Sequence, residues 1–379
     1  MYQIKKASVI GAGTMGLGIA GQLANAGIDV LLLDLPSNEG NRNAICERAI
    51  ERLLDEQQPG LLHKDILNRI SIGNIEDDIE KISESDWIAE AVVERLDIKK
   101  DLYRTIDRIR KQGSMVSSNT STIPISLLVE GMTESFKEEF AITHYFNPVR
   151  YMQLLEIVKG ESTKPEVIEC LSKFNEKEMG KGIVLCNDTP GFLGNRVGVF
   201  AIQTALHKAF EMNLEPEEAD AIFGRPMGIP KTGVFGLYDL IGIDLMADVL
   251  KSFIKELPEQ DPFQEVAKEI PLVKKLIETG YTGRKGKGGF YRMNKVNNQK
   301  ILEAINLESG DYYPSKKIDM GIDTVNLKEL INRKDKYGEY SWSVISKIIK
   351  YASSLVPGIT DKFNDIDEAM RLGFNWAMG

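Results

Sequence analysis

The sequence predicts an α/β protein whose first half holds a parallel sheet and whose second half is mainly helical. Three observations favour this class. Short apolar segments and helical segments alternate over residues 1–187, as strands and helices do around a parallel sheet. From residue 188 onward, the pattern changes to helices separated by Pro and Gly. A chain of 379 residues is also long for one compact domain, so we expect more than one.

In the first half, the predicted strands are apolar and short. They lie at 6–10, 28–33, 70–72, 87–93 and 115–118, with two more between 141 and 158 on either side of a loop that contains Pro148. Apart from Asp29, the strand at 28–33 is apolar, as expected when helices cover both faces of the sheet. The intervening helices are predicted at 14–26 and, as a helical hairpin that turns at Pro59-Gly60, at 41–69.

The second half is predicted to hold helices at 196–212, 216–223, 238–257 and 263–279. Residues 293–334 are polar and aperiodic, which predicts a linker. Residues 335–379 regain helical periodicity and faintly repeat the start of the helical part, since an acidic helix leads to Met227-Gly228 in one copy and to Met378-Gly379 in the other. Chance recurrence explains this pattern about as well as a true repeat. A true repeat that stops there would suggest a fragment or shortened form of a longer protein.

Composition narrows the class of protein. A net charge of −9 argues against a surface for nucleic acid or for an anionic membrane. No apolar run approaches the ~20 residues that a membrane-spanning helix needs, and the first residues run straight into a strand, without room for a signal peptide. Three scattered cysteines and three histidines predict neither disulfides nor a metal site. We therefore expect a cytoplasmic protein.

A glycine-rich motif joins the first predicted strand to the first helix. Its residues are Gly11-Ala12-Gly13-Thr14-Met15-Gly16. In a dinucleotide-binding turn the first glycine permits the tight turn, the second lets the backbone approach a pyrophosphate, and the third lets helix and strand pack closely. Alone, the motif is as often a plain glycine turn. Its place between strand and helix, and Asp34 at the end of the next strand, favour a Rossmann-type fold.

Asp34 also bears on the choice of cofactor. A carboxylate at this position accepts hydrogen bonds from both ribose hydroxyls and repels a 2′-phosphate. The following Leu35-Pro36-Ser37 offers no arginine that would receive such a phosphate. The sequence therefore predicts NAD rather than NADP. Asp34 could instead cap the next helix, an alternative that the glycine motif disfavours.

One histidine is placed for proton transfer. Oxidation of an alcohol by a nicotinamide cofactor needs a base, usually histidine oriented by a carboxylate. His63 and His207 fall in predicted helices, whereas His144 ends a strand, where side chains of an α/β sheet reach ligands. Glu156 lies in an apolar segment, and an antiparallel hairpin centred near Arg150 would place it opposite His144. From spacing alone, a catalytic pair and a structural ion pair of Glu156 with a Lys or Arg are equally favoured.

Several further segments resemble the L-3-hydroxyacyl-CoA dehydrogenase family. They are Ser118-Asn119-Thr120-Ser121, His144-Tyr145-Phe146-Asn147-Pro148, Leu155-Glu156-Ile157, Asp188-Thr189-Pro190-Gly191-Phe192, Gly194-Asn195-Arg196 and the run from Gly283 to Tyr291. The resemblance covers residues 3–292, and residues 335–379 resemble the beginning of a second helical domain in longer multifunctional fatty-acid oxidation proteins.

This resemblance implies a fold with a site between two domains. A Rossmann-type NAD-binding domain (1–187) would precede an all-α domain like that of 6-phosphogluconate dehydrogenase (188–292), with the active site in the cleft between them. A linker (293–334) and a partial second helical repeat (335–379) would follow.

The resemblance also implies roles for individual residues. His144 would be the general base and Glu156 its orienting partner, while Ser121 and Asn195 would hold the substrate oxygen. Positions that match NAD contacts of the family are Glu94, Lys99, Asn147 and Lys285. Simpler interpretations stay open for three of these residues: Asn147 as a turn former, Lys99 as a solvated helix charge and Ser121 as a helix cap.

The function implied is the NAD-dependent oxidation of the 3-hydroxyl of an acyl-CoA in fatty-acid β-oxidation. A dehydrogenase of a free hydroxy acid is the alternative. A 3-hydroxyisobutyrate-like enzyme would use a catalytic lysine in the helical domain, whereas a gulonate-like enzyme shares the His–Glu arrangement and is harder to exclude. A non-catalytic NAD-binding protein is a third hypothesis, which the full set of catalytic residue types disfavours.

Two departures from the family leave matters open. The turn at 228–236 lacks the usual Gly-Pro-Phe-Glu-like sequence, so the geometry of a homodimer through the helical domain is undetermined. The hairpin at 41–69, which contacts CoA in relatives, is poor in lysine and offers no contact to carry over. Association with hydratase and thiolase partners is the alternative to a homodimer.

Overall fold

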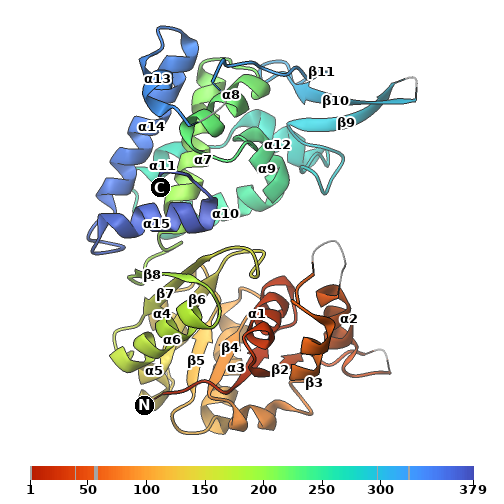
Figure 1. Ribbon diagram of the computed structural model, residues 1–379, viewed down its shortest axis with the longest axis vertical. Helices are drawn as coiled ribbons and strands as arrows, with labels where there is room; N and C mark the ends of the chain where they lie inside the picture. Colours follow the sequence, from red (N-terminus) through yellow and green to blue (C-terminus); the bar gives the residue numbers. More distant parts are fainter. Residues whose placement is uncertain (1, 39, 55–58, 297, 323–324) are drawn as a thin grey trace. The chain divides into compact units, whose positions relative to one another are not determined.

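The computed structural model describes residues 2–38, 40–54, 59–296, 298–322 and 325–379, and its chain divides into two compact units (Figure 1). The first unit is Met1–Phe192 and the second is Leu193–Gly379.

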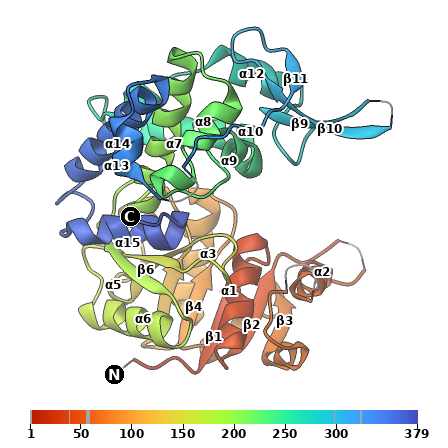
Figure 2. The same cartoon turned by 45° about the horizontal axis from the view of Figure 1, so that its top comes forward.

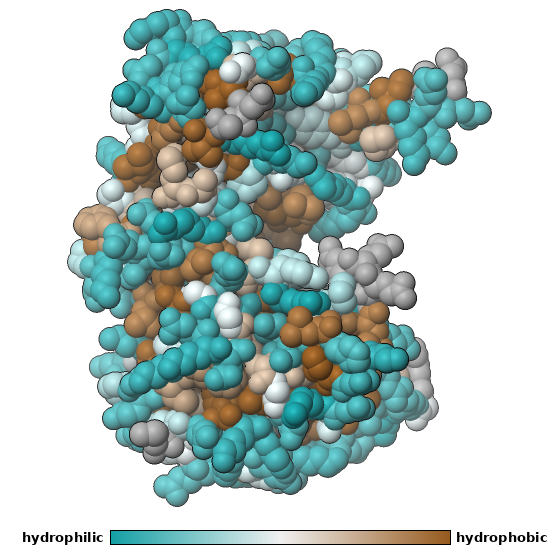
Figure 3. Space-filling model, in the orientation of Figure 1, coloured by the Kyte–Doolittle hydropathy of each residue, from teal (hydrophilic) through white to brown (hydrophobic). Residues whose placement is uncertain are grey.

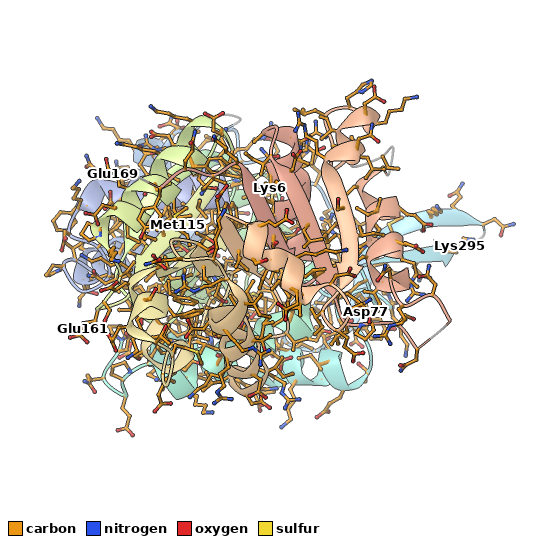
Figure 4. All side chains as sticks on the ribbon, turned by 90° about the horizontal axis from the view of Figure 1, so that it is seen from below. Lys6, Asp77, Met115, Glu161, Glu169 and Lys295 are labelled. Atoms are coloured by element: carbon orange, nitrogen blue, oxygen red, sulfur yellow. The ribbon has the colours of Figure 1, made fainter. Side chains whose placement is uncertain are left out.

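The first unit is built on an eight-stranded sheet. Its strands are β1 (Lys6–Ile10), β2 (Asp29–Asp34), β3 (Ile70–Asn74), β4 (Trp87–Glu90), β5 (Met115–Ser118), β6 (Phe140–Tyr145), β7 (Leu154–Lys159) and β8 (Gly182–Cys186). Their order is β3-β2-β1-β4-β5-β6-β7-β8. All neighbours pair in parallel except β6 and β7, which are antiparallel. Figure 4 shows Lys6 and Met115, the first residues of β1 and β5, at the amino edge of this sheet.

Helices cover both faces of the sheet, which explains why every residue of β4, β5 and β6 is buried. They are α1 (Thr14–Asn25), α2 (Ala44–Leu53), α3 (Leu96–Ile109), α4 (Ile125–Leu128), α5 (Glu134–Glu138) and α6 (Pro165–Lys177). Ile19 and Leu23 of α1 and Leu32 of β2 are fully buried in the resulting core. Burying a side chain of this size contributes roughly 1.5–3 kcal/mol.

Two predicted elements of this unit are wrong in detail. The second arm of the hairpin at 41–69 is a 3₁₀ helix (Lys64–Arg69), because the segment is capped by His63 and leads after six residues directly into β3. Residues 55–58 of that hairpin lie outside the described residues. The strand predicted at 87–93 ends at Glu90, whose carboxylate accepts the amide of Val92 and turns the chain toward α3.

The second unit is mainly helical. Its helices are α7 (Gly194–Glu211), α8 (Pro216–Ile222), α9 (Phe235–Ile241), α10 (Ile243–Glu256), α11 (Phe263–Val266), α12 (Pro271–Glu278), α13 (Leu327–Asn332), α14 (Lys336–Ser354) and α15 (Phe363–Phe374). The helix predicted at 238–257 is divided at Gly242, which has a φ of +112° that few other residues adopt. The helix predicted at 263–279 is also two helices, since Pro271 begins α12.

The central helix of this unit is α7, against which α8, α11, α14 and α15 pack. A side chain at Gly198 would meet the ring of Phe374 within 2.1 Å, so this glycine permits the close approach of α15. Phe200 of α7 stacks on Tyr351 of α14, with ring centres 3.9 Å apart. The two Met-Gly turns also meet, because the amide of Ala377 donates to the carbonyl of Gly228 at 2.7 Å.

The prediction of an aperiodic segment at 293–334 is wrong. It contains most of a three-stranded antiparallel sheet of β9 (Tyr291–Val296), β10 (Gln299–Ile305) and β11 (Tyr312–Pro314). The β9–β10 hairpin extends away from the helices (Figures 1 and 2). Only Glu303, Ala304 and Ile305 of β10 are buried, so the two strands contain no long apolar run, and an Arg292–Glu303 ion pair of 2.7 Å joins them. Such a pattern resembles a linker in the sequence.

Hydrophilic side chains cover most of the face drawn in Figure 3, with smaller apolar areas between them. None of the helices in the described part of the chain combines the length and the apolar character that crossing a bilayer would need. Within the same residues, no cluster of His, Cys, Asp and Glu side chains is suited to hold a metal ion.

Candidate active site

The glycine-rich turn between β1 and α1 is shaped by two of its glycines and left open by the third. Gly11 has a φ of +107°, and a Cβ atom there would lie 2.4 Å from the carbonyl oxygen of Ala91. A Cβ atom on Gly16 would lie 1.8 Å from the carbonyl oxygen of Gly11. In contrast, a Cβ atom on Gly13 would meet nothing within 4 Å. Gly13 is exposed, so a ligand can approach the backbone here, at the amino end of α1 formed by Thr14 and Met15.

Asp34 lies beside this turn. Its carboxylate accepts the amide of Ala12 through Oδ2 and the amide of Leu35, at 2.6 Å, through Oδ1. The helix that follows, α2, has Asn43 at its N-cap, so Asp34 does not cap that helix. The open glycine turn and the carboxylate at the end of β2 together fit the phosphates and the ribose of a dinucleotide.

His144 and Glu156 face one another across the antiparallel pair β6–β7, in the register that the sequence predicted. The distance from His144 Nδ1 to Glu156 Oε2 is 2.7 Å. His144 is 6% exposed and Glu156 is fully buried, at 0%. A carboxylate at this distance assigns the proton to Nδ1, so Nε2 is the nitrogen that can accept a proton. Glu156 also accepts a weak hydrogen bond from the Cys186 thiol, at 3.8 Å.

Aromatic rings and a buried lysine hold the segment around His144. Its imidazole contacts the rings of Phe146 and Phe192, with ring centres 4.7 Å and 5.6 Å away. Lys181 donates from Nζ to the carbonyls of Val149 and, at 2.8 Å, Met152, which belong to the loop after β6. Burial lowers the pKa of the Lys181 ammonium to about 8. No sequence signal pointed to Lys181.

A second buried carboxylate, Glu90, lies at the end of β4. It is 0% exposed and accepts the Lys99 ammonium at 2.7 Å, the Ser118 hydroxyl at 2.7 Å and the Tyr103 hydroxyl. Lys99 is 1% exposed, so it is not the solvated helix charge that remained possible from the sequence. Glu90 was not among the predicted site residues, although, like Glu156, it is a carboxylate in an apolar strand.

Lys99 links Glu90 to Glu94, whose Oε2 lies 3.3 Å from the ammonium. Glu94 also accepts the hydroxyls of Thr122, at 3.0 Å, and Thr120. Burial acts to raise the pKa of Glu94, but the Lys99 charge and the two hydroxyls outweigh it and hold that pKa below its usual value. Glu94 is thus an ionised carboxylate beside the loop that carries Ser121.

Ser121 is half-buried in the loop between β5 and α4, where its carbonyl accepts the amide of Gly191 at 3.0 Å. Pro124, not Ser121, is the N-cap of α4, and Asp188 accepts the amide of Ile125 at 2.8 Å. Ser121 is therefore not the cap of this helix. Asn147 is exposed and precedes Pro148 in the loop after β6.

Two predicted site residues belong to the second unit. Asn195 lies in the first turn of α7 and is half-buried. Lys285 is exposed and forms an ion pair with Asp244, with its Nζ 3.1 Å from Oδ1.

Within the first unit, the candidate residues gather at one edge of the sheet. The glycine turn, Asp34, Glu94, Ser121 and His144 each lie at or just after the carboxyl end of a strand, and those strands are parallel to one another. β1 lies between β2 and β4, where the order of strands reverses, and ligands of such sheets bind at this point. The fold and this edge define the class of α/β proteins that bind a nicotinamide dinucleotide.

The chain belongs to the 3-hydroxyacyl-CoA dehydrogenase family. Residues 6–189 match the family described as "3-hydroxyacyl-CoA dehydrogenase, NAD binding domain", and residues 191–293 match "3-hydroxyacyl-CoA dehydrogenase, C-terminal domain". The match confirms the predicted family, the Rossmann-type domain followed along the chain by a helical domain, and NAD as the cofactor.

Individual relatives agree with this assignment. The chain is 42% identical over 378 residues to a "Putative fatty acid oxidation complex trifunctional enzyme" of Rickettsia prowazekii, a match that covers 100% of this chain and 52% of that protein. It is 38% identical to a "Probable 3-hydroxyacyl-CoA dehydrogenase" of Deinococcus radiodurans, covering 77% of this chain and 84% of that protein. The chain thus spans about half the length of the Rickettsia relative.

Among solved structures, 3-hydroxybutyryl-CoA dehydrogenase from Escherichia coli K12 matches with a TM-score of 0.76 and 26% identity. That match covers 99% of this chain and 89% of the other. Similarity over nearly the whole chain includes the segment beyond residue 293.

Proposed function

We propose that this chain oxidises L-3-hydroxyacyl-CoA to 3-ketoacyl-CoA with NAD⁺, as a step of fatty-acid β-oxidation in the cytoplasm. The observation that carries the proposal is the 2.7 Å contact between His144 and the buried Glu156, at the sheet edge where the glycine turn lies. Family membership supports the thioester substrate, since relatives over this part of the chain are named as dehydrogenases of acyl-CoA.

His144 and Glu156 perform the proton transfer. Nε2 of His144 removes the proton of the 3-hydroxyl while hydride leaves C3, and NAD⁺, when bound, supplies the hydride acceptor. Glu156 stabilises the imidazolium through Nδ1 and keeps the ring in the required tautomer. Phe146 and Phe192 limit rotation of the ring.

Other residues bind and orient the reactants. The amides around Gly13, with Thr14 and Met15, would hold the cofactor phosphates, and Asp34 would accept the ribose hydroxyls. Glu94, oriented by Lys99, and Asn147 would contact the nicotinamide half, with Lys285 contributing from the second unit. Ser121 and Asn195 would donate hydrogen bonds to the substrate oxygen.

The test is NADH consumption with acetoacetyl-CoA by the unmodified chain and by its His144→Ala variant. Turnover should fall by about 10²–10⁴-fold in the variant, the usual contribution of a general base. NADH binding, measured by fluorescence, should stay unchanged and show that the variant is folded. An unmodified chain that binds NADH and oxidises free 3-hydroxy acids, but leaves acyl-CoA untouched, would contradict the proposal.

We also propose that the chain works beside hydratase and thiolase activities, because the Rickettsia relative is named as a trifunctional enzyme of a fatty-acid oxidation complex. Homodimerisation through the helical unit is the alternative proposal. Light scattering during gel filtration decides between a single chain and a dimer.

A further inference from the structure

An arginine of α2 contacts the glycine-rich turn. Arg52 lies in the last turn of α2, and its Nη2 donates to the carbonyl of Ala12 at 2.9 Å. The amide of the same Ala12 donates to Asp34. A guanidinium and a carboxylate therefore hold the two polar groups of one residue of the turn.

Two neighbouring arginines are neutralised in a different way. Arg42 pairs with Glu76 and Asp77, each at 2.6 Å, and Arg69 pairs with Asp29 at 2.9 Å. For Arg52, the contact among the described residues is the neutral carbonyl of Ala12. A guanidinium has five N–H donors, and this contact occupies one of them. Among the residues that the structure describes, no carboxylate pairs with Arg52, so its other N–H donors can meet an anionic ligand.

The position of Ala12 indicates which part of a ligand Arg52 would meet. In a dinucleotide-binding turn, the carboxylate at the end of the second strand binds the adenosine ribose. Arg52 and Asp34 meet at the same residue, so Arg52 lies at the adenosine side of the turn. Gly13, next in the chain, is the open position at which the phosphates approach.

We propose that Arg52 is a further cofactor-binding residue, whose guanidinium binds the phosphate on the adenosine side of the dinucleotide. The residues after Asp34 provide no arginine for a 2′-phosphate, but Arg52 provides a cation from α2 instead. This cation would offset part of the repulsion between Asp34 and a 2′-phosphate, so we expect weak NADPH binding. The inference rests on the dinucleotide site and not on the proposed oxidation of acyl-CoA.

CoA also carries phosphates on its adenosine, which a guanidinium could bind. The experiment must therefore distinguish binding of the dinucleotide from binding of CoA. NADH, NADPH, ADP-ribose, nicotinamide mononucleotide and CoA are titrated by calorimetry against the full chain. The variants are Arg52→Gln, Arg52→Lys and, as a matched control in the same region, Arg69→Gln. Arg52 is exposed, so the substitutions should not disturb the core.

Arg52→Gln should weaken NADH and ADP-ribose by about tenfold, as expected for the loss of one charge-assisted hydrogen bond, and NADPH by more. Arg52→Lys should recover part of the affinity, because it keeps the charge without the planar fork. Nicotinamide mononucleotide should bind equally to all variants, and Arg69→Gln should match the parent. Unchanged NADH affinity in Arg52→Gln, an equal loss in Arg69→Gln, or a loss confined to CoA would each overturn the proposal.

Discussion

Two buried carboxylates of the first sheet, Glu156 and Glu90, are alike in the sequence and differ in the structure. Both lie in apolar strands and both are 0% exposed. Glu156 binds an imidazole across an antiparallel pair of strands. Glu90 binds an ammonium that comes from the following helix, together with two hydroxyls.

The difference lies in what the partner can do. An imidazole gains and loses a proton near neutral pH, so a carboxylate beside it can support proton transfer. The ammonium of Lys99 contacts both Glu90 and Glu94 and serves to fix the two carboxylates. A buried carboxylate in an apolar strand therefore indicates a residue of the site. The chemistry of its partner then decides whether the carboxylate supports proton transfer or only positions other groups.

The largest effect on stability is expected at Lys99. Replacement by Met leaves Glu90 buried without its cation, which costs about 3–5 kcal/mol for a broken buried pair. NADH affinity should also fall, because Glu94 loses its orientation. Lys100→Met is the control, since Lys100 pairs with the exposed Glu130 and should cost less than about 1 kcal/mol. Urea unfolding measures both, and equal costs would show that Lys99 does not fix the two carboxylates.

Lys181 is a useful contrast to Lys99, because its ammonium is buried against carbonyl groups rather than carboxylates. Its pKa is lowered from 10.5 to about 8, so between these values the unfolded chain binds the proton and the folded chain does not. The free energy of unfolding therefore gains a contribution that rises with pH over that window. Parent and Lys181→Met should diverge in the parent's favour from pH 8 to 10.5 in urea titrations. Parallel curves would contradict this pKa.

A smaller effect is expected at Ser121. Ser121→Ala should lower kcat/KM by about tenfold through the loss of one hydrogen bond to the substrate oxygen, with NADH affinity unchanged. Ser126→Ala is the matched control, because Ser126 is an exposed serine of the nearby helix α4. If both variants retain full kcat/KM with acetoacetyl-CoA, Ser121 does not contact the substrate.

Much of the first unit could be predicted because strong local patterns agree with tertiary structure there. The glycine turn, the buried strands and the register of His144 with Glu156 all follow from apolar periodicity and turn residues. The burial of Lys99 could not be predicted, since a lysine in an amphipathic helix normally faces solvent. Lys99 contacts Glu90 only through the way α3 packs on the sheet, which the sequence pattern does not show.

The second unit was harder to predict for a different reason. In β9 and β10 apolar and polar residues do not alternate regularly, and only the end of β10 is buried, so these strands lack the pattern that identifies a strand. The break at Gly242 lies inside a continuous amphipathic pattern, and a glycine within such a pattern does not by itself end a helix. The assigned roles of Asn195 and Lys285 stay predictions.

The central claim is that His144 and Glu156 act as one unit, and a double-mutant cycle tests it most directly. Turnover of acetoacetyl-CoA with NADH is measured for the parent, Glu156→Gln, His144→Ala and the double variant. Glu156→Gln should cost about a hundredfold or more in the parent and almost nothing in the His144→Ala background. Losses that multiply, with Glu156→Gln costing the same factor in both backgrounds, would show that Glu156 supports the fold and does not act through His144.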